Sequence, residues 1–433
     1  MTDGLRKLFE NARIIDPASG LDIEGSILIR DDRIEKIAAS SEMDEYVGSG
    51  EVSRIDVSGM IIAPGLVDTH VHFRDPGFTE KEDINTGAAA AKAGGYTSVV
   101  MMANTKPSVD SVETLKYMLD KGAQTGIKVY ACGNVTMGMA GRELTDMTTL
   151  REAGAVGFTD DGLPLLDEKL TAEAMRKCRE LNVPISFHEE DPQYISQNGV
   201  NHGKASNHFG IEGSDRKAEI SMIERDIRLA RETGAKVVVQ HISTAEGVDL
   251  VRRAKAEGLD VHAEATPHHF SLTEDAVIEH GTLAKMNPPL RTEEDRQAII
   301  AGLKDGSIDM IATDHAPHTA EEKSRELTKA PSGIIGLETA LSLGITELVD
   351  KGYMTLSELL MRMTAGPADV YSMDAGRLCE GGAADIVVFD ANVSRKVPAV
   401  FASKAQNSPF IGREVSGKIL YTVCNGNTVF EGR

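Results

Sequence analysis

The sequence has few cysteines, and their spacing pairs none of them. Cys132, Cys178, Cys379 and Cys424 are the four cysteines among 433 residues, and no CxxC motif is present. A disulfide framework or a structural zinc knuckle requires closely spaced sets of cysteines. The scatter therefore predicts small buried thiols in a reducing compartment, which is the cytoplasm by default.

The chain also lacks long apolar runs. Its apolar stretches, such as 237–239 and 386–389, have the length of a strand, whereas a membrane-spanning helix needs about 20 apolar residues. The segment 1–16, MTDGLRKLFENARIID, contains no apolar core of a secretion signal. We therefore expect a cytoplasmic protein that has no membrane partner.

Positive charge is in deficit. The chain carries 46 lysines and arginines against 67 aspartates and glutamates, for a net charge of −21. An acidic surface repels phosphate backbones, so nucleic acid is excluded as a partner. A small anionic substrate stays compatible with this charge, because a pocket can carry positive charge of its own.

The two ends of the chain, 1–60 and 371–433, read as short strands and turns. Residues 26–30, SILIR, alternate as in a half-exposed antiparallel strand, and NGN at 425–427 is a strong hairpin signal. Neither segment is large enough to bury a core alone. We predict that they join as the two parts of one small β-sandwich, which flanks a larger domain over 61–370.

In the segment 61–370, apolar runs of strand length alternate with amphipathic helical segments. Runs that are too apolar for one exposed face, each followed by a helix, indicate a parallel sheet covered by helices. Counting the opening run at Ile61 gives eight runs, which favours a closed (β/α)8 barrel. An open doubly wound sheet is the alternative that the periodicity alone leaves open.

Histidines and a carboxylate follow several of these runs, at the end of a barrel where active sites are built. His70 and His72 lie in GLVDTHVHFRDPG (65–77), two positions apart, so on a strand both rings point the same way and can bind one metal ion. His188 and His241 end two other runs and form a second pair. Asp314 ends the run IDMIA, and a carboxylate there can bind a metal and still take up a proton.

An anionic bridge is needed if two metal ions lie about 3.5–4 Å apart. No lysine occurs between Arg151 and Glu168, which excludes a carboxylated lysine in that stretch. The motif FTDDG offers Asp160 and Asp161 instead. Spacing alone leaves both candidates open, although we expect one of them, Asp160, to be the turn residue before Gly162.

Arg74 continues the alternation of the two histidines. A guanidinium group can hold a carboxylate through two parallel hydrogen bonds, so Arg74 is a candidate for binding an acidic substrate. The alternative is a salt bridge with Asp75 or Asp83.

Other polar groups are candidate substrate contacts. The amides of Asn104 and Asn287 donate and accept at once, and the loop APSGIIG can present the backbone of Ser332 and Gly333 to a ligand, although both MNPPLR and APSGIIG also fit ordinary turns. We interpret seven further histidines as structural or indirect: His202, His208, His262, His268, His269, His280 and His315.

Taken together, six motifs resemble those of the dihydroorotases of the amidohydrolase superfamily. They are GLVDTHVHFRDPG, MMANTKPSVDS, GFTDDG, MNPPLR, TDHAPH and APSGIIGLETA, and the resemblance covers nearly the whole chain. The HxHxR triplet followed by NTKP is the most specific part. Hydantoinases and allantoinases share the barrel and the histidines but usually carry a bridging lysine.

The resemblance implies a (β/α)8 barrel with a composite β-sandwich, one or two zinc ions, with two expected, and the interconversion of dihydroorotate and N-carbamoyl-aspartate in pyrimidine synthesis. It implies these roles: His70 and His72 bind the first zinc; His188 and His241 bind the second; Asp161 bridges; Asp314 is both ligand and general base; and His72, Arg74, Asn104, Asn287, His318, Ser332 and Gly333 contact the substrate. A homodimer and a complex with aspartate transcarbamoylase stay open as assemblies. The alternatives are a related cyclic amidase and a non-catalytic scaffold for aspartate transcarbamoylase.

Overall fold

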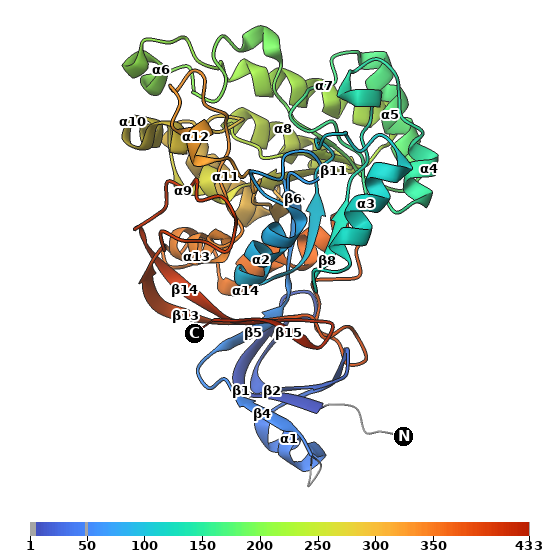
Figure 1. The fold of residues 1–433 in the computed structure, drawn as a ribbon, viewed down its shortest axis with the longest axis vertical. Coiled ribbons are helices and arrows are strands. Elements are labelled where there is room, and N and C mark those ends of the chain that lie inside the picture. Colours follow the sequence, from blue (N-terminus) through green and yellow to red (C-terminus); the bar gives the residue numbers. More distant parts are fainter. Residues whose placement is uncertain (1–5, 48–50, 433) are drawn as a thin grey trace.

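A computed structural model describes residues 6–47 and 51–432 of the chain. It shows a ring of parallel strands and helices above a smaller β domain, with the first and last segments of the chain side by side in the lower part (Figure 1). The predicted fold class, an α/β barrel with a small β domain built from both ends of the chain, is confirmed. Where a β-sandwich was expected, the described strands of that domain form one mixed sheet.

The β domain is one mixed eight-stranded sheet, accompanied by helix α1 (Ser40–Val47). Its strands are β1 (Arg6–Asp16), β2 (Leu21–Arg30), β3 (Arg33–Ala38), β4 (Ser53–Asp56), β5 (Ile61–Pro64), β13 (Ile386–Lys396), β14 (Glu414–Cys424) and β15 (Asn427–Glu431). The order is β15-β14-β13-β5-β1-β2-β3, with β4 beside β1. Strand β5 joins the two halves, because it pairs with β1 on one side and with β13 on the other.

The barrel strands are parallel and fall into two runs, β6-β7-β8 and β9-β10-β11-β12. They are β6 (Leu66–Val71), β7 (Tyr96–Met101), β8 (Lys128–Ala131), β9 (Ile185–Phe187), β10 (Val237–Val239), β11 (Val261–Ala265) and β12 (Met310–Ile311). Isolated bridges close the ring: Phe158 pairs with Gly133 and with Ile185, and Val71 pairs with His315. The run at 155–161 therefore lies between β8 and β9, and through Phe158 it adds an eighth member to the seven named barrel strands.

The first barrel strand differs from the expected one. The run at Ile61 was predicted to open the barrel, but Ile61–Pro64 forms β5 in the flanking sheet, and β6 opens the barrel. The chain passes from one sheet to the other at Gly65, whose N–H donates to the carbonyl of Asp385. A Cβ atom at Gly65 would lie 2.2 Å from Oγ1 of Thr97, so only glycine fits at this crossing.

Helices cover the outside of the ring. They are α2 (Ile84–Ala93), α3 (Val112–Gly122), α4 (Met147–Glu152), α5 (Glu168–Glu180), α6 (Lys204–Phe209), α7 (Lys217–Thr233), α8 (Ala245–Ala256), α9 (Pro267–Ser271), α10 (Asp275–His280), α11 (Glu293–Asp305), α12 (Ala320–Lys323), α13 (Ala340–Gly344), α14 (Leu356–Met363) and α15 (Ala365–Val370), with 3₁₀ turns η1 (Met137–Met139), η2 (Pro192–Tyr194) and η3 (Gly281–Ala284) and a π turn η4 (Ile345–Val349). Thr292 and Thr355 begin α11 and α14 with capping boxes, each satisfying otherwise free backbone donors. In the described residues, no helix has the length and apolar character to cross a membrane.

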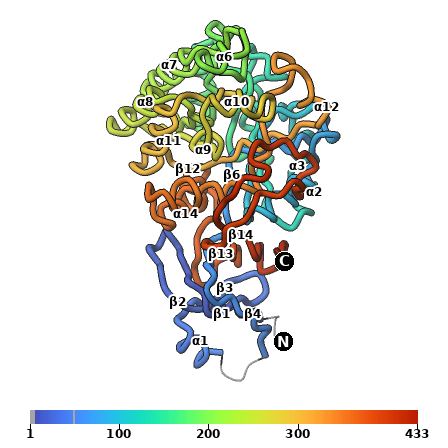
Figure 2. The backbone as a smooth tube through the Cα atoms, turned by 90° about the vertical axis from the view of Figure 1, so that its left-hand side faces the viewer, coloured from blue at the N-terminus to red at the C-terminus, as the bar shows by residue number. Residues whose placement is uncertain are grey.

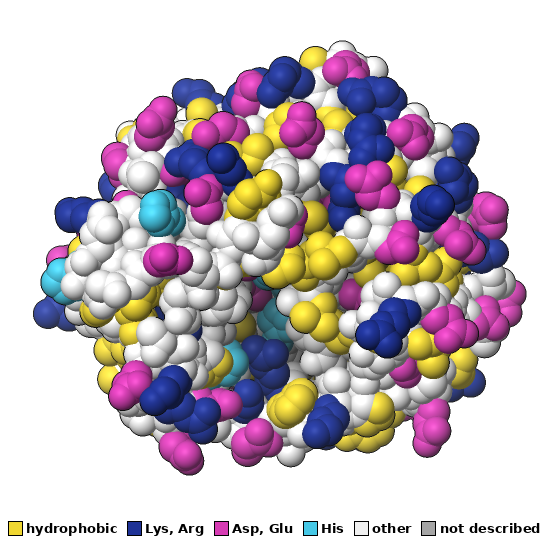
Figure 3. Space-filling view, turned by 90° about the horizontal axis from the view of Figure 1, so that it is seen from above, with side chains coloured by type: hydrophobic (Ala, Val, Ile, Leu, Met, Phe, Trp, Pro, Cys, Tyr) yellow, Lys and Arg dark blue, Asp and Glu magenta, His cyan; other side chains and the backbone are white. Residues whose placement is uncertain are grey.

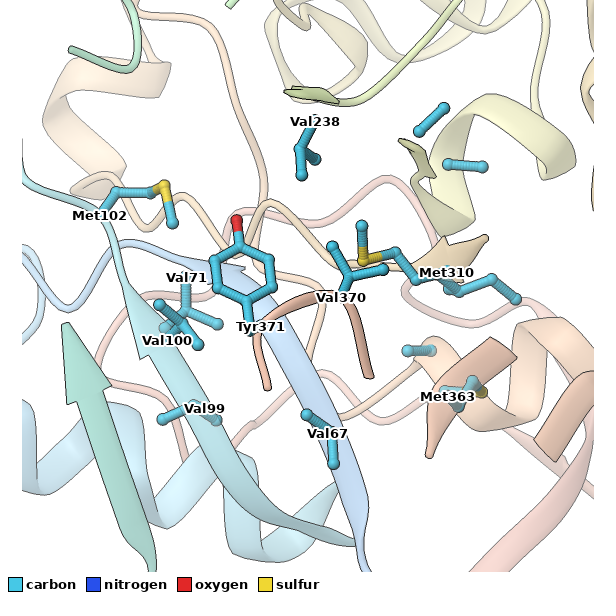
Figure 4. Packing of buried hydrophobic residues seen from close by; sticks show 14 of the residues in the cluster. Val67, Val71, Val99, Val100, Met102, Val238, Met310, Met363, Val370 and Tyr371 are labelled. Carbon is cyan, nitrogen blue, oxygen red and sulfur yellow. The ribbon is translucent and has the colours of Figure 1, made fainter. Parts of the chain in front are cut away.

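The barrel interior is filled by side chains. Figure 4 shows Val67, Val71, Val99 and Val100 of neighbouring strands close to Tyr371, which follows α15. Branched side chains of this kind give a packed core, so the chemistry has to take place at the strand ends. Of the cysteines, Cys132, Cys178 and Cys424 are buried as expected, whereas Cys379 is exposed, in the loop between α15 and β13, contrary to the prediction.

Candidate metal centre and substrate site

The candidate metal ligands come from different strands and meet at the carboxyl end of the barrel. His70 lies in β6, and His72 directly after it; His188 follows β9, His241 follows β10 and Asp314 follows β12. All five side chains are buried. Seen from above, the molecule is hollowed over this end, with histidine and basic side chains inside the hollow (Figure 3).

Asp161 lies at the centre of the four histidines. Its Oδ1 is 3.6 Å from Nε2 of His70, 3.7 Å from Nδ1 of His188 and 3.8 Å from Nε2 of His241. Its Oδ2 is 3.5 Å from Nε2 of His72. A carboxylate that faces both histidine pairs has the geometry of a bridging ligand.

Asp314 completes the group on the side of β12. Its Oδ1 is 3.0 Å from Nε2 of His72 and 3.6 Å from Nε2 of His70. Two sets, His70–His72–Asp314 and His70–Asp161–His241, each bring three donor atoms within 4.8 Å of one another. Two ligand atoms about 2.1 Å from a tetrahedral ion lie about 3.4 Å apart, which agrees with these separations.

The histidines and carboxylates of the candidate metal centre shift one another's pKa values. Burial favours neutral histidines, but the carboxylates of Asp161 and Glu264 raise the pKa of His70 well above its usual value. Burial also opposes protonation of His188, yet Asp161 and Glu190 raise the pKa of His188 to about 10. Burial raises the pKa of Asp161, and the neighbouring histidines reverse this and hold it well below its usual value. The carboxylates that raise the pKa of His70 and His188 are oxygens that would also stabilise a metal cation in the same place.

Two buried glutamates contact the ring nitrogens of His70 and His188 that face away from Asp161. Nδ1 of His70 lies 3.0 Å from Oε2 of Glu264, and Nε2 of His188 lies 2.9 Å from Oε2 of Glu190. Such a partner fixes which ring nitrogen faces the metal. Sequence reasoning missed both glutamates, although Glu264 was visible as a carboxylate inside an apolar strand run.

Three residues of the site have strained backbone. Arg74 (φ 60°), His241 (φ 33°) and Asp314 (φ 48°) all adopt positive φ values. Side chains other than glycine rarely adopt this conformation, and it persists where the surrounding structure enforces it. The strain turns these three residues away from the direction in which each strand would continue.

A cavity of about 150 Å³ opens beside the metal centre. It is lined by His72, Arg74, Asn104, Asp161, Gly162, His188, His241, Asn287, Asp314, Ala316, Ser332 and Gly333. The Asn104 amide contacts two candidate metal ligands, since its Oδ1 is 3.0 Å from Nδ1 of His72 and its Nδ2 donates to Asp161. It is therefore not free for the substrate contact that the sequence predicts. The Oδ1 atom of Asn287 is buried and has no partner within the described residues, so it is available to a ligand.

Arg74 is half-buried at the wall of this cavity. Its Nε donates to the carbonyl of Pro317 at 3.3 Å. The expected alternative partners are engaged elsewhere, because Asp75 pairs with Lys121 and Asp83 pairs with Lys404. The guanidinium thus faces the site with donors left for a ligand.

His318 is placed differently from the other predicted substrate contacts. It is absent from the cavity wall given above, and its Nε2 donates to the carbonyl of Ser332 at 2.8 Å. It lies instead on the wall of a neighbouring cavity of about 540 Å³, together with Asn407 and Lys323. In this arrangement His318 supports the loop that carries Ser332 and Gly333.

Asp160 points away from the metal centre. Its carboxylate accepts hydrogen bonds from the backbone N–H groups of Val135 and Thr136, and from the side chains of Asn134 and Thr136. The adjacent aspartates therefore have separate tasks, because Asp160 ties two loops together while Asp161 faces the histidines.

We predict that alanine substitution of Asp161 reduces metal binding, whereas alanine substitution of Asp160 reduces stability. Asp161→Ala should lower the bound metal per chain, measured by elemental analysis, while the fold persists. Asp160→Ala should leave the metal content near that of the wild type and lower the free energy of unfolding by about 1–3 kcal/mol, because buried donors lose their acceptor. The reverse order of metal loss would make Asp160, and not Asp161, the candidate bridging ligand.

The fold and the site define a class of protein, a barrel enzyme whose ligand set suits metal-assisted hydrolysis. Residues 61–429 match the model of the Amidohydrolase family. The chain is 52% identical to the dihydroorotase of Clostridioides difficile (strain 630) over 423 residues, covering 98% of this chain and 99% of that one. It is 49% identical to the dihydroorotase of Lactococcus lactis subsp. lactis (strain IL1403) over 426 residues, covering 98% and 99%.

Among solved structures, the L-hydantoinase (dihydropyrimidinase) from Arthrobacter aurescens superposes with a TM-score of 0.88 at 26% identity, covering 98% of this chain and 96% of that chain. The dihydropyrimidinase from Brevibacillus agri NCHU1002 has a TM-score of 0.83 at 21% identity, covering 99% and 95%, which bears on the fold alone. The chain belongs to the amidohydrolase family and, within it, to the dihydroorotases.

Proposed function

We propose that this enzyme interconverts dihydroorotate and N-carbamoyl-aspartate, opening the ring by hydrolysis and closing it by the reverse reaction, in pyrimidine synthesis. The observation that carries the proposal is Arg74 beside a buried set of four histidines and two aspartates, in a chain about half identical to dihydroorotases throughout its length. The histidines and aspartates suit a metallohydrolase, and the guanidinium suits a substrate with a carboxylate.

We propose zinc as the metal, with two ions per chain. The donor set of imidazoles and carboxylates suits zinc. Nε2 of His70, which faces Asp161, is buried without a hydrogen-bond partner in the described part of the chain, as expected of a nitrogen that binds a metal ion. His70, His72 and Asp314 would hold one ion, His188 and His241 the other, and Asp161 would bridge. When bound, zinc lowers the pKa of water and polarises a carbonyl.

Asp314 would act as the proton carrier of the reaction. Burial raises the pKa of its carboxyl group, but hydrogen bonding to His72 and the nearby histidine charges lower it far more, so the group is ionised at neutral pH. In the hydrolytic direction it accepts a proton from the attacking water and returns it to the ring nitrogen as the C–N bond breaks. Ring closure moves the same proton in the opposite direction.

The remaining groups would orient the substrate. Arg74 binds its carboxylate, and Asn287 and the backbone of Ser332 and Gly333 meet the ring amides. Because these groups lie on loops after different strands, the substrate is held between them, with its scissile bond over the metal centre.

A substrate panel with the metal removed and restored tests the proposal. We expect zinc-loaded protein to turn over dihydroorotate, chelated protein to lose turnover, and added zinc to restore it. Dihydrouracil and allantoin, which lack the carboxylate, should react far more slowly. Faster turnover of either would replace the proposal with a related cyclic amidase, and zinc binding without turnover of any of the three would indicate a scaffold.

The cytoplasmic location, the homodimer, the aspartate transcarbamoylase complex and the domain limits 1–60, 61–370 and 371–433 stay predictions of the sequence. Native mass spectrometry with and without aspartate transcarbamoylase measures both assemblies.

A further inference from the structure

The segment 397–413, between β13 and β14, leaves the β domain and runs over the barrel. Val397, Phe401 and Phe410 are buried in the core cluster that includes the barrel strands. Figure 2 shows the red tube of this segment rising beside α2, in agreement with the ion pair between Lys404 and Asp83, the residue that caps α2. The last part of the chain therefore reaches the end of the barrel that carries the site.

Two carboxylates, Glu82, which is buried, and Glu338, which is half-buried, anchor this segment. Glu82 accepts from the hydroxyl of Ser403 and from the N–H of Lys404, and Glu338 accepts from the N–H groups of Ala402 and Ser403. Anchored in this way, the next few residues have a fixed place on the barrel.

Asn407 follows these anchors and joins two loops of the site. Its Oδ1 accepts from the N–H of His318 at 3.2 Å, and its Nδ2 donates to the carbonyls of Ala316 at 3.2 Å and Gly333 at 3.1 Å. Its own carbonyl accepts from the N–H of Ile335 at 3.1 Å. The side chain is buried, and its amide uses both donors and its acceptor.

The two loops that Asn407 joins touch each other closely. The N–H of Ala316 donates to the carbonyl of Ile334 at 2.7 Å. Gly333 has φ +111°, and a Cβ atom there would lie 2.6 Å from Cβ of Ala316. Ala316, Ser332 and Gly333 all line the cavity of the site. A small shift of either loop would therefore change the wall against which a substrate packs.

We propose that Asn407 is a positioning residue, which holds the Ser332–Gly333 loop and the Ala316–His318 loop in the register that binds substrate. The proposal rests on the function proposed above. Asn407 itself touches neither the candidate metal ligands nor the cavity; it acts through the carbonyl of Gly333 and the N–H of His318. The C-terminal segment thereby helps to build a substrate site that otherwise belongs to the barrel.

The chemistry of the side chain makes the proposal specific. The position needs one acceptor and two donors in a planar group, which asparagine supplies. In Asn407→Asp the shape and the acceptor remain, but a carboxylate replaces the two N–H donors and faces the carbonyls of Ala316 and Gly333. In Asn407→Ala the whole amide is lost without any new charge.

The test compares both variants with the wild type in zinc-loaded form. We expect KM for dihydroorotate to rise about tenfold while kcat changes less, since lost substrate binding appears mainly in KM. Zinc content should equal that of the wild type. Hydrogen exchange measured by mass spectrometry should speed up in peptides that cover 314–319 and 330–336, but not in peptides that cover β13 and β14.

Asn427→Asp is the matched control, because Asn427 is exposed on β15 and, within the described residues, its amide donates only to Asn425 in the same turn. An unchanged KM for both Asn407 variants would overturn the proposal, whether exchange stays the same or rises throughout the chain. If Asn407→Asp does not fold, Asn407→Ala decides alone. A wild type that fails to turn over dihydroorotate refutes the proposed function instead, and the exchange of the two loops then still tests the positioning role.

Discussion

Asp314→Asn is expected to lower kcat for dihydroorotate by about 10²- to 10⁴-fold, the range that general acid–base catalysis contributes. The substitution keeps the size of the side chain and the oxygen that lies 3.0 Å from Nε2 of His72. An amide, however, cannot take up the proton of the attacking water. Steady-state turnover measured beside zinc content separates this loss from loss of metal.

Asp309→Asn is the matched control, because Asp309 precedes the same strand, β12, at its opposite end. Its carboxylate accepts from Lys255 Nζ, lies 2.9 Å from Nδ1 of His262 and accepts from the N–H of Ala263. Residues at the amino end of a barrel strand contribute stability rather than chemistry. The control should therefore unfold at a lower temperature and retain kcat. Turnover near normal in Asp314→Asn with full zinc content would remove Asp314 from the role of base.

The barrel was predictable because its signal is local. Apolar runs of strand length, each followed by an amphipathic segment, fix the alternation of strands and helices. The error at the opening run has a non-local cause. Ile61–Pro64 and Leu66–Val71 are both buried along their whole length, and only the contact of Gly65 with Thr97, together with the pairing of β5 with β1 and β13, decides which run belongs to which sheet.

The candidate site likewise has one part that the sequence predicts and one part that only the fold shows. His70 and His72 are two positions apart on one strand, so their common direction follows from the sequence. Their support does not, because the Glu264 carboxylate that meets His70 lies 194 positions along the chain. Asn407, 89 positions after His318, was likewise invisible without the fold. Sequence patterns report residue types at strand ends, whereas packing between distant segments decides which of them orient the site.

Arg74→Ala is expected to lower kcat/KM for dihydroorotate by about 10²- to 10³-fold, the loss typical of a buried charge pair deprived of one partner. Burial lowers the pKa of Arg74, and the carboxylates of Asp314 and Asp161 oppose this shift, so the guanidinium stays charged at every working pH. Its one hydrogen bond within the described chain, to Pro317, uses Nε and leaves the terminal nitrogens for a substrate. The loss should appear mostly in KM.

The comparison with a neutral ring identifies the group that Arg74 recognises. Dihydrouracil lacks the carboxylate of dihydroorotate, so its kcat/KM should change little in Arg74→Ala, and the preference of the enzyme for the acidic substrate should fall by nearly the whole factor. Arg74→Lys keeps the charge but not the planar pair of donors, and we expect it to recover part of the loss. Arg13→Ala removes an exposed arginine paired with Asp22 and should affect neither substrate. Equal losses for both substrates would mean that Arg74 supports the cavity wall through Pro317, and carboxylate recognition would then have to be sought in Asn287 and the Ser332–Gly333 backbone.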